Sequence, residues 1–133
     1  MSRVLGIDYG TKRVGVAISD PLGMTAQPLE VISASAARTE IARLAADYDV
    51  ERIVVGLPVG LSGTEGPAAA AARAFAEELR ESSGIAVEMV DERFSTSTAE
   101  RTMKQAGVAG RRRRHLVDKV AATVILQDFL DRR

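Results

Sequence analysis

The stretch RVLGIDYGTKRVGVAISD, residues 3–20, holds two runs rich in Val and Ile, Arg3–Asp8 and Arg13–Asp20, with a short break around Gly10 between them. Two strand-like runs on either side of such a break predict a β-hairpin, and Gly10 is available for a positive φ in its turn. Both runs are apolar at successive positions, which is typical of strands in a sheet that is covered on both faces. We therefore expect this hairpin at the centre of the fold, with Asp8 at the end of a central strand.

Beyond the hairpin, the chain alternates between strand patterns and helix patterns. Further strands are expected within Ala26–Ser33 and at Arg52–Leu57 and Ile85–Val90. Helices are expected at Ala36–Asp47, Ala68–Glu81, Ser97–Gln105 and His115–Asp131. Pro28 should lie near the start of its strand or on an exposed side, because proline cannot donate to the ladder. This order predicts an α/β fold, with a five-stranded mixed sheet flanked by helices, in a single domain over residues 1–133.

The composition excludes several classes of protein. Hydrophobic residues make up 46% of the chain and charged residues 27%, which is the balance of an ordinary globular domain. There is no cysteine, so neither a disulfide framework nor a thiolate metal site is expected. No apolar run approaches the roughly 18 residues that span a bilayer, and the N-terminus lacks a secretory pattern. A cytoplasmic protein that has no membrane partner is the expectation.

The charge of the chain is zero in sum but uneven along its length. Residues 1–92 carry 8 Lys and Arg against 14 Asp and Glu, whereas residues 93–133 carry 10 against 4. A basic C-terminal segment beside an acidic centre suits a protein that binds the phosphates of a nucleic acid. A solvated basic tail explains the same charges equally well.

Acidic side chains stand at three places where they could meet. Asp8 ends a wholly apolar run, and a carboxylate buried there would need a cation or hydrogen-bond donors to compensate its charge. Alternatively, Asp8 is a turn residue whose side chain accepts hydrogen bonds from backbone N–H groups. Asp91 and Glu92 end the fifth expected strand, and only one of them can share a face with Asp8, because side chains alternate. The spacing does not decide which. Asp118 falls on the apolar stripe of the last helix, or acts as a first-turn acid that interacts with the helix dipole.

Three convergent carboxylates would suit Mg²⁺ or Mn²⁺ and disfavour zinc, and such sites commonly serve phosphodiester hydrolysis. His115 lies one helical turn before Asp118 and could be a fourth ligand or a proton carrier, although a solvated histidine on a basic surface is the more frequent situation. The arginine run after Gly110 could contact phosphates through charge and bidentate hydrogen bonds. No aromatic residue is interleaved with this run, so base-specific recognition of single strands is not indicated.

Four segments, in order along the chain, resemble one known family. They are Leu5–Asp20 (LGIDYGTKRVGVAISD), Val54–Gly66 (VVGLPVGLSGTEG), Val90–Thr96 (VDERFST) and Val117–Leu130 (VDKVAATVILQDFL). Over nearly its whole length the sequence resembles the YqgF family, also called RuvX, of Holliday junction resolvases and ribosomal RNA precursor nucleases. The resemblance implies a ribonuclease H-like fold. It also implies a cytoplasmic role in ribosome biogenesis, in which the 5′ end of pre-16S rRNA is processed.

By motif position, the resemblance assigns Asp8, Glu92 and Asp118 as the catalytic and metal-binding carboxylates, and so favours Glu92 over Asp91. Asp8 would bridge two metal ions, and each of the other two acids would complete one coordination sphere. The candidates for holding the nucleic-acid backbone are Lys12, Arg13, Arg93, Arg111, Arg112, Arg113, Arg114 and His115. The implied partners are structured RNA, branched DNA and ribosomal precursor particles, bound by a monomer or a homodimer.

The glycine-rich loop Gly60–Pro67 departs from the family pattern. Gly60, Leu61 and Ser62 stand where the family often has Asn and Asp. This difference argues against a fixed polar contact between the loop and the substrate. A flexible loop that faces nucleic acid is compatible with it.

Three other readings of the sequence stay open. Asp8, Gly10 and Thr11 also match the Asp-x-Gly-Thr phosphate loop of sugar kinases and actin-type ATPases, but those proteins clasp nucleotide between two lobes and this chain has the length of one. A nucleic-acid-binding, ribosome-associated protein with weak or no catalysis would keep the same motifs. Cleavage of DNA junctions would use the same chemistry, in a protein expected to be a symmetric dimer.

Overall fold

The computed structural model describes residues 3–60, 63–91 and 110–133, and in the last segment it describes side chains from Val120 onward. Its centre is one five-stranded sheet in the order β3-β2-β1-β4-β5. The strands are β1 Arg3–Tyr9, β2 Arg13–Ser19, β3 Ala26–Ser33, β4 Val50–Leu57 and β5 Ala86–Asp91. The β1–β2–β3 meander is antiparallel, while β4 and β5 run parallel to β1. The mixed sheet and the central place of β1 are therefore confirmed.

The turn between β1 and β2 differs from the prediction. Gly10 does not adopt a positive φ; the described glycines that do are Gly23, Gly63 and Gly84. A Cβ at Gly10 would instead lie 2.6 Å from the carbonyl oxygen of Arg13, which is closer than real Cβ contacts come. The turn needs glycine because the two chain segments approach closely, and the prediction of a left-handed residue was wrong.

The strand β3 forms one edge of the sheet. Pro28 is exposed on it and pairs with Ala17, directly after a register shift in the β2–β3 ladder. Proline is tolerated there because an edge strand can leave one N–H position unpaired. The expected place of Pro28 is confirmed.

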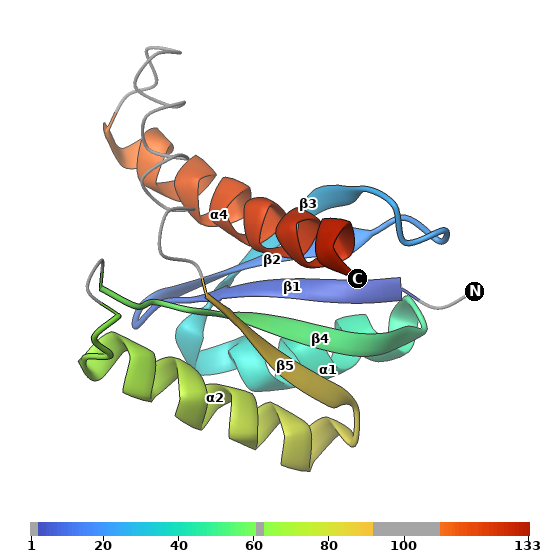
Figure 1. Cartoon of the computed structure of the whole chain (residues 1–133), viewed down its shortest axis with the longest axis horizontal. Coiled ribbons are helices and arrows are strands. Elements are labelled where there is room, and N and C mark those ends of the chain that lie inside the picture. The colour runs from blue at the N-terminus through green and yellow to red at the C-terminus, as the bar shows by residue number, and fades with distance from the viewer. Residues whose placement is uncertain (1–2, 61–62, 92–109) are drawn as a thin grey trace.

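Helices cover both faces of the sheet (Figure 1). On one face lie α1 Ala37–Asp47, which follows the short 3-10 helix Ala34–Ala36, and α2 Pro67–Ser83. Proline at the first position of α2 suits a helix start, since its missing N–H would have no partner there. These helices enclose the larger part of the core with strand residues such as Ile7 and Ile53, which are fully buried.

The long helix α4, Gly110–Arg132, lies alone on the other face among the described elements (Figure 1). Its residues Ala122, Ile125 and Leu126 are buried against Val4 and Val54 of the sheet, and Ala121 is buried as well. This confirms the apolar stripe expected for the last helix. The close approach depends also on Gly6 of β1, because a Cβ there would lie 2.6 Å from Cβ of Leu126 and 3.0 Å from the carbonyl oxygen of Ala122.

The start of α4 corrects the sequence prediction. The helix begins at Gly110, five residues before the expected start at His115, and takes in the arginine run 111–114. Arginine is a good helix former, so propensity favours this extension over the loop that the flanking glycine suggested. The helix expected at Ser97–Gln105 lies outside the described residues. Within the described part of the chain, no helix has the length and apolarity needed to cross a membrane.

The β2–β3 connection supplies a pH-dependent prediction. The carboxylate of Asp20 accepts hydrogen bonds from the backbone N–H groups of Thr25 at 3.0 Å and Met24 at 2.7 Å. These bonds hold the pKa of Asp20 below its ordinary value of 3.8. Because its pKa is lower in the folded state, the ionised Asp20 carboxylate stabilises the fold at pH values above its ordinary pKa. This stabilisation is lost as the pH falls through the pKa of the folded state.

The Asp20→Asn variant should therefore melt at a lower temperature than wild type at neutral pH. The difference should shrink as pH falls below the ordinary aspartate pKa and through the lower pKa of Asp20 in the folded state. Thermal unfolding of both proteins across this pH range checks the prediction. A difference in Tm that stays constant with pH would contradict it.

Candidate active site

Asp8 lies half-buried near the carboxyl end of the central strand β1. Along this strand, Leu5 and Ile7 point into the core beneath α1 and α2, whereas Val4 packs against α4. Because side chains alternate, Asp8 shares the α4 face with Val4 and Gly6. The sequence prediction of a carboxylate at the end of a central strand is confirmed.

In the two strands that flank Asp8, the positions directly beside it are glycines. In β2, Asp8 pairs with Gly15, and in β4 the position after the Ile7–Val55 pair is Gly56. Both glycines are buried. The sequence analysis missed this pair, because only the register of the sheet brings Gly15 and Gly56 to either side of Asp8. Strand registers inferred from the hairpin length could have indicated Gly15.

The carboxyl ends of β1, β4 and β5 meet at one edge of the sheet, since these strands are parallel. In open α/β sheets this edge is where functional groups gather. The turn after β1 carries Lys12, which is exposed, and Arg13 at the start of β2, which is half-buried. Both candidate phosphate-binding residues of the hairpin therefore lie at the same edge as Asp8.

Asp91, the last residue of β5, lies on the wrong face to join Asp8. It pairs with Leu57 of β4. Met89, two residues earlier in β5, packs against the core under α1 and α2, whereas Val90 packs against the buried residues under α4. Alternation thus places the Asp91 side chain on the face opposite Asp8. Asp91 therefore does not share a face with Asp8, and Glu92 stays a prediction.

The other predicted site residues are not placed by the structure. Glu92 and Arg93 lie outside the described residues, and the side chains of Asp118, His115 and the arginine run 111–114 belong to the part of α4 whose backbone alone is described. Among the side chains that are described, no three of Asp, Glu or His come together as a possible metal site. Asp8 is the one member of the predicted carboxylate set whose surroundings the structure gives.

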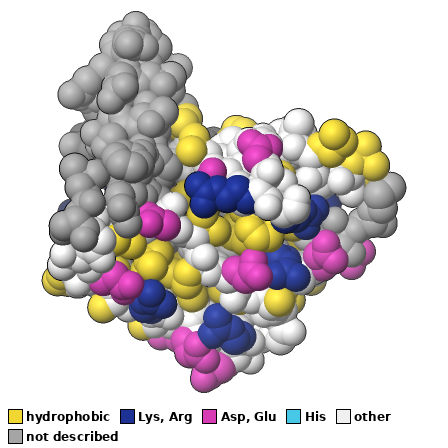
Figure 2. Space-filling model, viewed as in Figure 1, with side chains coloured by type: hydrophobic (Ala, Val, Ile, Leu, Met, Phe, Trp, Pro, Cys, Tyr) yellow, Lys and Arg dark blue, Asp and Glu magenta, His cyan; other side chains and the backbone are white. Residues whose placement is uncertain are grey.

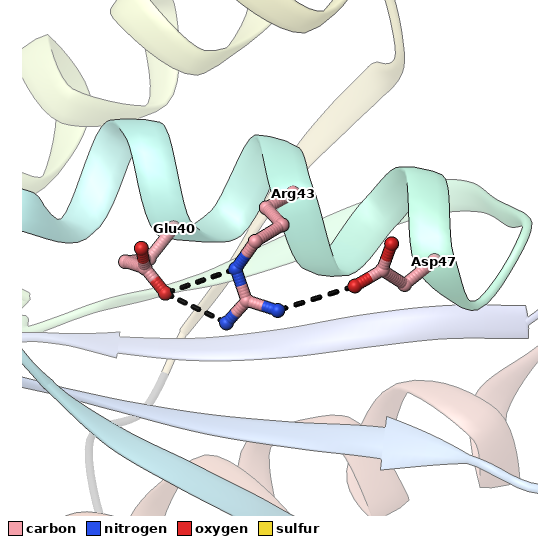
Figure 3. Close-up of polar contacts among 3 residues, drawn as sticks. All are labelled: Glu40, Arg43 and Asp47. Atoms are coloured by element: carbon pink, nitrogen blue, oxygen red, sulfur yellow. Dashed lines mark hydrogen bonds and ion pairs between the residues drawn. The ribbon is translucent and has the colours of Figure 1, made fainter.

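The far side of the molecule is poorly suited to nucleic acid. On α1, Arg43 is held by Glu40 at 2.7 Å and by Asp47 at 3.1 Å, so its charge is offset by two carboxylates (Figure 3). In the view that shows α4, Lys and Arg side chains are interspersed with Asp and Glu over the described surface (Figure 2). On the described part of both surfaces, basic and acidic side chains therefore alternate (Figure 2).

The strand order, the parallel β1–β4–β5 half and the acid at the end of β1 define an α/β protein of the ribonuclease H-like class. A family model described as "RuvX: Holliday junction resolvase" matches residues 2–132. The chain belongs to the RuvX family.

Curated relatives agree with this family. A protein of Bacillus cereus (strain AH187) is 51% identical over 136 residues, which covers 98% of this chain and 99% of the relative. A protein of Bacillus anthracis (strain CDC 684 / NRRL 3495) is 51% identical over 134 residues, at 97% and 98% coverage. Both carry the name "Putative pre-16S rRNA nuclease".

Solved structures share the fold at low sequence identity. RuvC of T. thermophilus, in complex with a Holliday junction substrate, superposes with a TM-score of 0.59 at 16% identity, covering 99% of this chain and 96% of RuvC. The Fowlpox virus resolvase, in complex with Holliday junction DNA, gives a TM-score of 0.58 at 11% identity, with 98% and 97% coverage. At such identities the similarity establishes the ribonuclease H-like fold and nothing further.

Proposed function

We propose that this chain is a divalent-metal-dependent nuclease, a hydrolase of phosphodiester bonds, that processes the 5′ end of pre-16S rRNA during ribosome biogenesis. The observation that carries the proposal is the place of Asp8: at the end of the central strand, on the α4 face, between two glycines. The names of the curated relatives support RNA as the substrate. Residues 1–133 would act as a single nuclease domain in the cytoplasm.

The proposed catalytic set is Asp8, Glu92 and Asp118. Support for Glu92 comes from its neighbour Asp91, which lies on the opposite face of the sheet from Asp8. Support for Asp118 comes from the course of α4, whose residues Ala122 and Leu126 lie over Gly6. Four residues back from Ala122 is about 6 Å of helix rise, and two residues forward from Gly6 is about 7 Å of strand, and these similar distances support Asp118 as a partner of Asp8.

The donor set fits Mg²⁺ or Mn²⁺, because carboxylate oxygens without thiolate are the ligands that these hard cations prefer. On either side of Asp8, the neighbouring strands place glycines, Gly15 and Gly56. When bound, such cations would make water a nucleophile at neutral pH and neutralise charge on the phosphate. Asp8 would hold the cation on the α4 face, and Lys12 and Arg13 would attract the phosphate backbone from the hairpin.

The contacts to nucleic acid would involve both charge clusters predicted from the sequence. Lys12 and Arg13 lie at the edge that holds Asp8. We propose that Arg93, Arg111, Arg112, Arg113, Arg114 and His115 extend this surface. The arginine run belongs to the first turns of α4, which would give the basic residues a helical frame. The protein would act as a monomer or a homodimer on structured RNA, within ribosomal precursor particles.

Purified protein should cleave a labelled transcript that spans the 5′ end of pre-16S rRNA when Mg²⁺ or Mn²⁺ is present. EDTA should abolish cleavage, and excess metal should restore it, because the carboxylates alone cannot activate water. A four-way DNA junction tested beside the transcript distinguishes the RNA nuclease from a junction resolvase. Binding of RNA without cleavage in either metal would leave a binding protein as the better account, and binding of ATP would favour the phosphate-loop reading.

A further inference from the structure

The end of β3 and the turn between β1 and β2 lie side by side, at the end of the sheet where Asp8 lies (Figure 1). The N–H of Ala34, the first residue after β3, donates to the carbonyl oxygen of Lys12 at 2.9 Å. Arg13, the next residue along the chain, pairs with Ser33 in the β2–β3 ladder. These contacts join two segments that are distant in sequence into one surface. We call their polar side chains the hairpin-serine surface: Lys12, Arg13, Ser33 and Ser35.

The Arg13 side chain shares a face of the sheet with Asp8. In β2, Ala17 packs under α4 whereas Val14 belongs to the core under α1 and α2, so alternation places Arg13 on the α4 face. Asp8 pairs with Gly15, two residues after Arg13, which makes Arg13 a diagonal neighbour of Asp8. Diagonal neighbours lie about 7–8 Å apart, within the reach of a long side chain. The hairpin-serine surface thus begins directly beside Asp8.

The two serine hydroxyls are not used by the helix that they precede and enter. Ser33 is the N-cap residue of the 3-10 helix, but its side chain makes no cap hydrogen bond. Serine at this position ordinarily accepts a hydrogen bond from a backbone N–H of the helix. Instead, Oγ of Ser33 lies 2.9 Å from Oγ of Ser35, and both residues are exposed. Each hydroxyl carries one donor, so the pair keeps one O–H that can donate to an anion.

The charge of Lys12 is not offset by a carboxylate among the residues that the structure describes. Lys12 is exposed, and no Asp or Glu of the described segments pairs with it. Elsewhere on the described surface, several arginines lie within ion-pair distance of Asp or Glu: Arg38, Arg43, Arg52, Arg73, Arg80 and Arg132. The hairpin-serine surface therefore combines an ammonium group with hydroxyl donors, which are groups that commonly contact nucleic-acid phosphates.

We propose that the hairpin-serine surface is a second phosphate-binding subsite, which takes a backbone phosphate next to the scissile one and directs the substrate strand across β2 towards β3. The inference rests on the proposed nuclease function, in which the scissile phosphate lies at Asp8. From Asp8 to Ser33 is a distance of roughly 12 Å, given strand spacings of about 4.8 Å and an offset of about 7 Å along the strands. One phosphate group is too small to touch both residues, so the serine hydroxyls contact a neighbouring phosphate. Such contacts fix the register of the strand and read no base.

The test compares the full-length wild type with Ser33→Ala, Ser33→Asp and Lys12→Ala. Fluorescence anisotropy gives Kd for a labelled RNA oligonucleotide from the 5′ end region of pre-16S rRNA, with Ca²⁺ in place of Mg²⁺. A second series of oligonucleotides carries one uncharged methylphosphonate linkage, which is moved stepwise along the strand. Ser82→Asp is the matched control, because Ser82 is exposed near the end of α2, ahead of the amino end of β5 and far from the edge that holds Asp8. Thermal unfolding verifies that each variant is folded.

Ser33→Asp should raise Kd about tenfold, because it brings a carboxylate to the bound phosphate, and Ser33→Ala should raise it about threefold through the loss of one hydrogen bond. Lys12→Ala should lower the slope of log Kd against log salt concentration by about one. Ser82→Asp should bind within about twofold of wild type, because salt screens a distant charge. A methylphosphonate at the neighbouring linkage should reduce the effect of Ser33→Asp, and this coupling identifies the phosphate that is bound.

Three results would overturn the subsite. They are additive effects of Ser33→Asp and the methylphosphonate at every linkage, equal weakening by Ser33→Asp and Ser82→Asp, and failure of wild type to bind the RNA. Absence of cleavage by wild type in Mg²⁺ and Mn²⁺ would count against the nuclease function, whereas the coupling measured by Kd would still decide whether the hairpin-serine surface holds a phosphate.

Discussion

Asp8→Asn is expected to abolish cleavage, with kcat at least about a hundredfold below wild type, while the protein keeps its fold. The substitution removes the charge that a divalent cation requires and changes the volume of the side chain very little. Asp8 is half-buried at the end of β1, on the face away from the larger core cluster, so hydrophobic packing there should be preserved. Cleavage rates with saturating transcript and Mg²⁺ check the first part.

Thermal unfolding checks the second part of this prediction. Mg²⁺ or Mn²⁺ should raise the Tm of wild type by binding the folded state, and the same ions should have less effect on Asp8→Asn. Asp91→Asn is the matched control, because it is the same chemical change at the same edge but on the opposite face. A large loss of Tm in Asp8→Asn without metal would identify a structural carboxylate, and loss of activity in Asp91→Asn alone would reverse the assignment.

Gly6→Ala should destabilise the fold by about 1–3 kcal/mol, because it overfills the contact between β1 and α4. The new Cβ would lie 2.6 Å from Cβ of Leu126 and 3.0 Å from the carbonyl oxygen of Ala122. Neither atom is the end of a flexible side chain, so no rotamer change relieves the overlap and α4 must move away from the sheet. Denaturant unfolding measures the loss.

The same variant should also lose nuclease activity, since α4 carries Asp118. Gly66→Ala provides the control: nothing lies within 4 Å of a Cβ at that position, which precedes α2. Its cost should stay below about 1 kcal/mol, the scale of a helix-cap change. A Gly6→Ala protein as stable as Gly66→Ala would show that α4 does not rest on β1 as closely as the structure indicates.

The sequence was most informative where a local rule sufficed. Two runs rich in Val and Ile on either side of a short break predicted the hairpin, and the strand expected within Ala26–Ser33 occupies that whole range. Errors arose at helix ends, as in α4, because several starts have nearly equal local free energy. The role of Gly10 was predicted wrongly. A turn can require glycine for a positive φ or for the close approach of two backbone segments, and the local sequence does not show which of the two applies.

The candidate site was foreseen only in part. That Asp8 ends a central strand follows from its apolar run, and a resemblance of motifs selected Glu92 and Asp118 as its partners. The side of the sheet on which Asp91 lies could not be derived, since a shift of one residue in the register of β5 would reverse it. Gly56 comes beside Asp8 only through the pairing of β1 with β4, two strands that are distant in sequence.

By itself, the sequence determined which of the described segments are strands and helices, that the sheet is covered on both faces and that an acid stands at the end of its central strand. These properties follow from hydrophobic periodicity and residue chemistry, which act over a few neighbouring residues. Tertiary structure alone decided which face Asp8 shares with α4 and that Gly6 lets α4 approach. Strand register and helix packing are set by the burial of the whole core, and no local stretch of sequence contains that information.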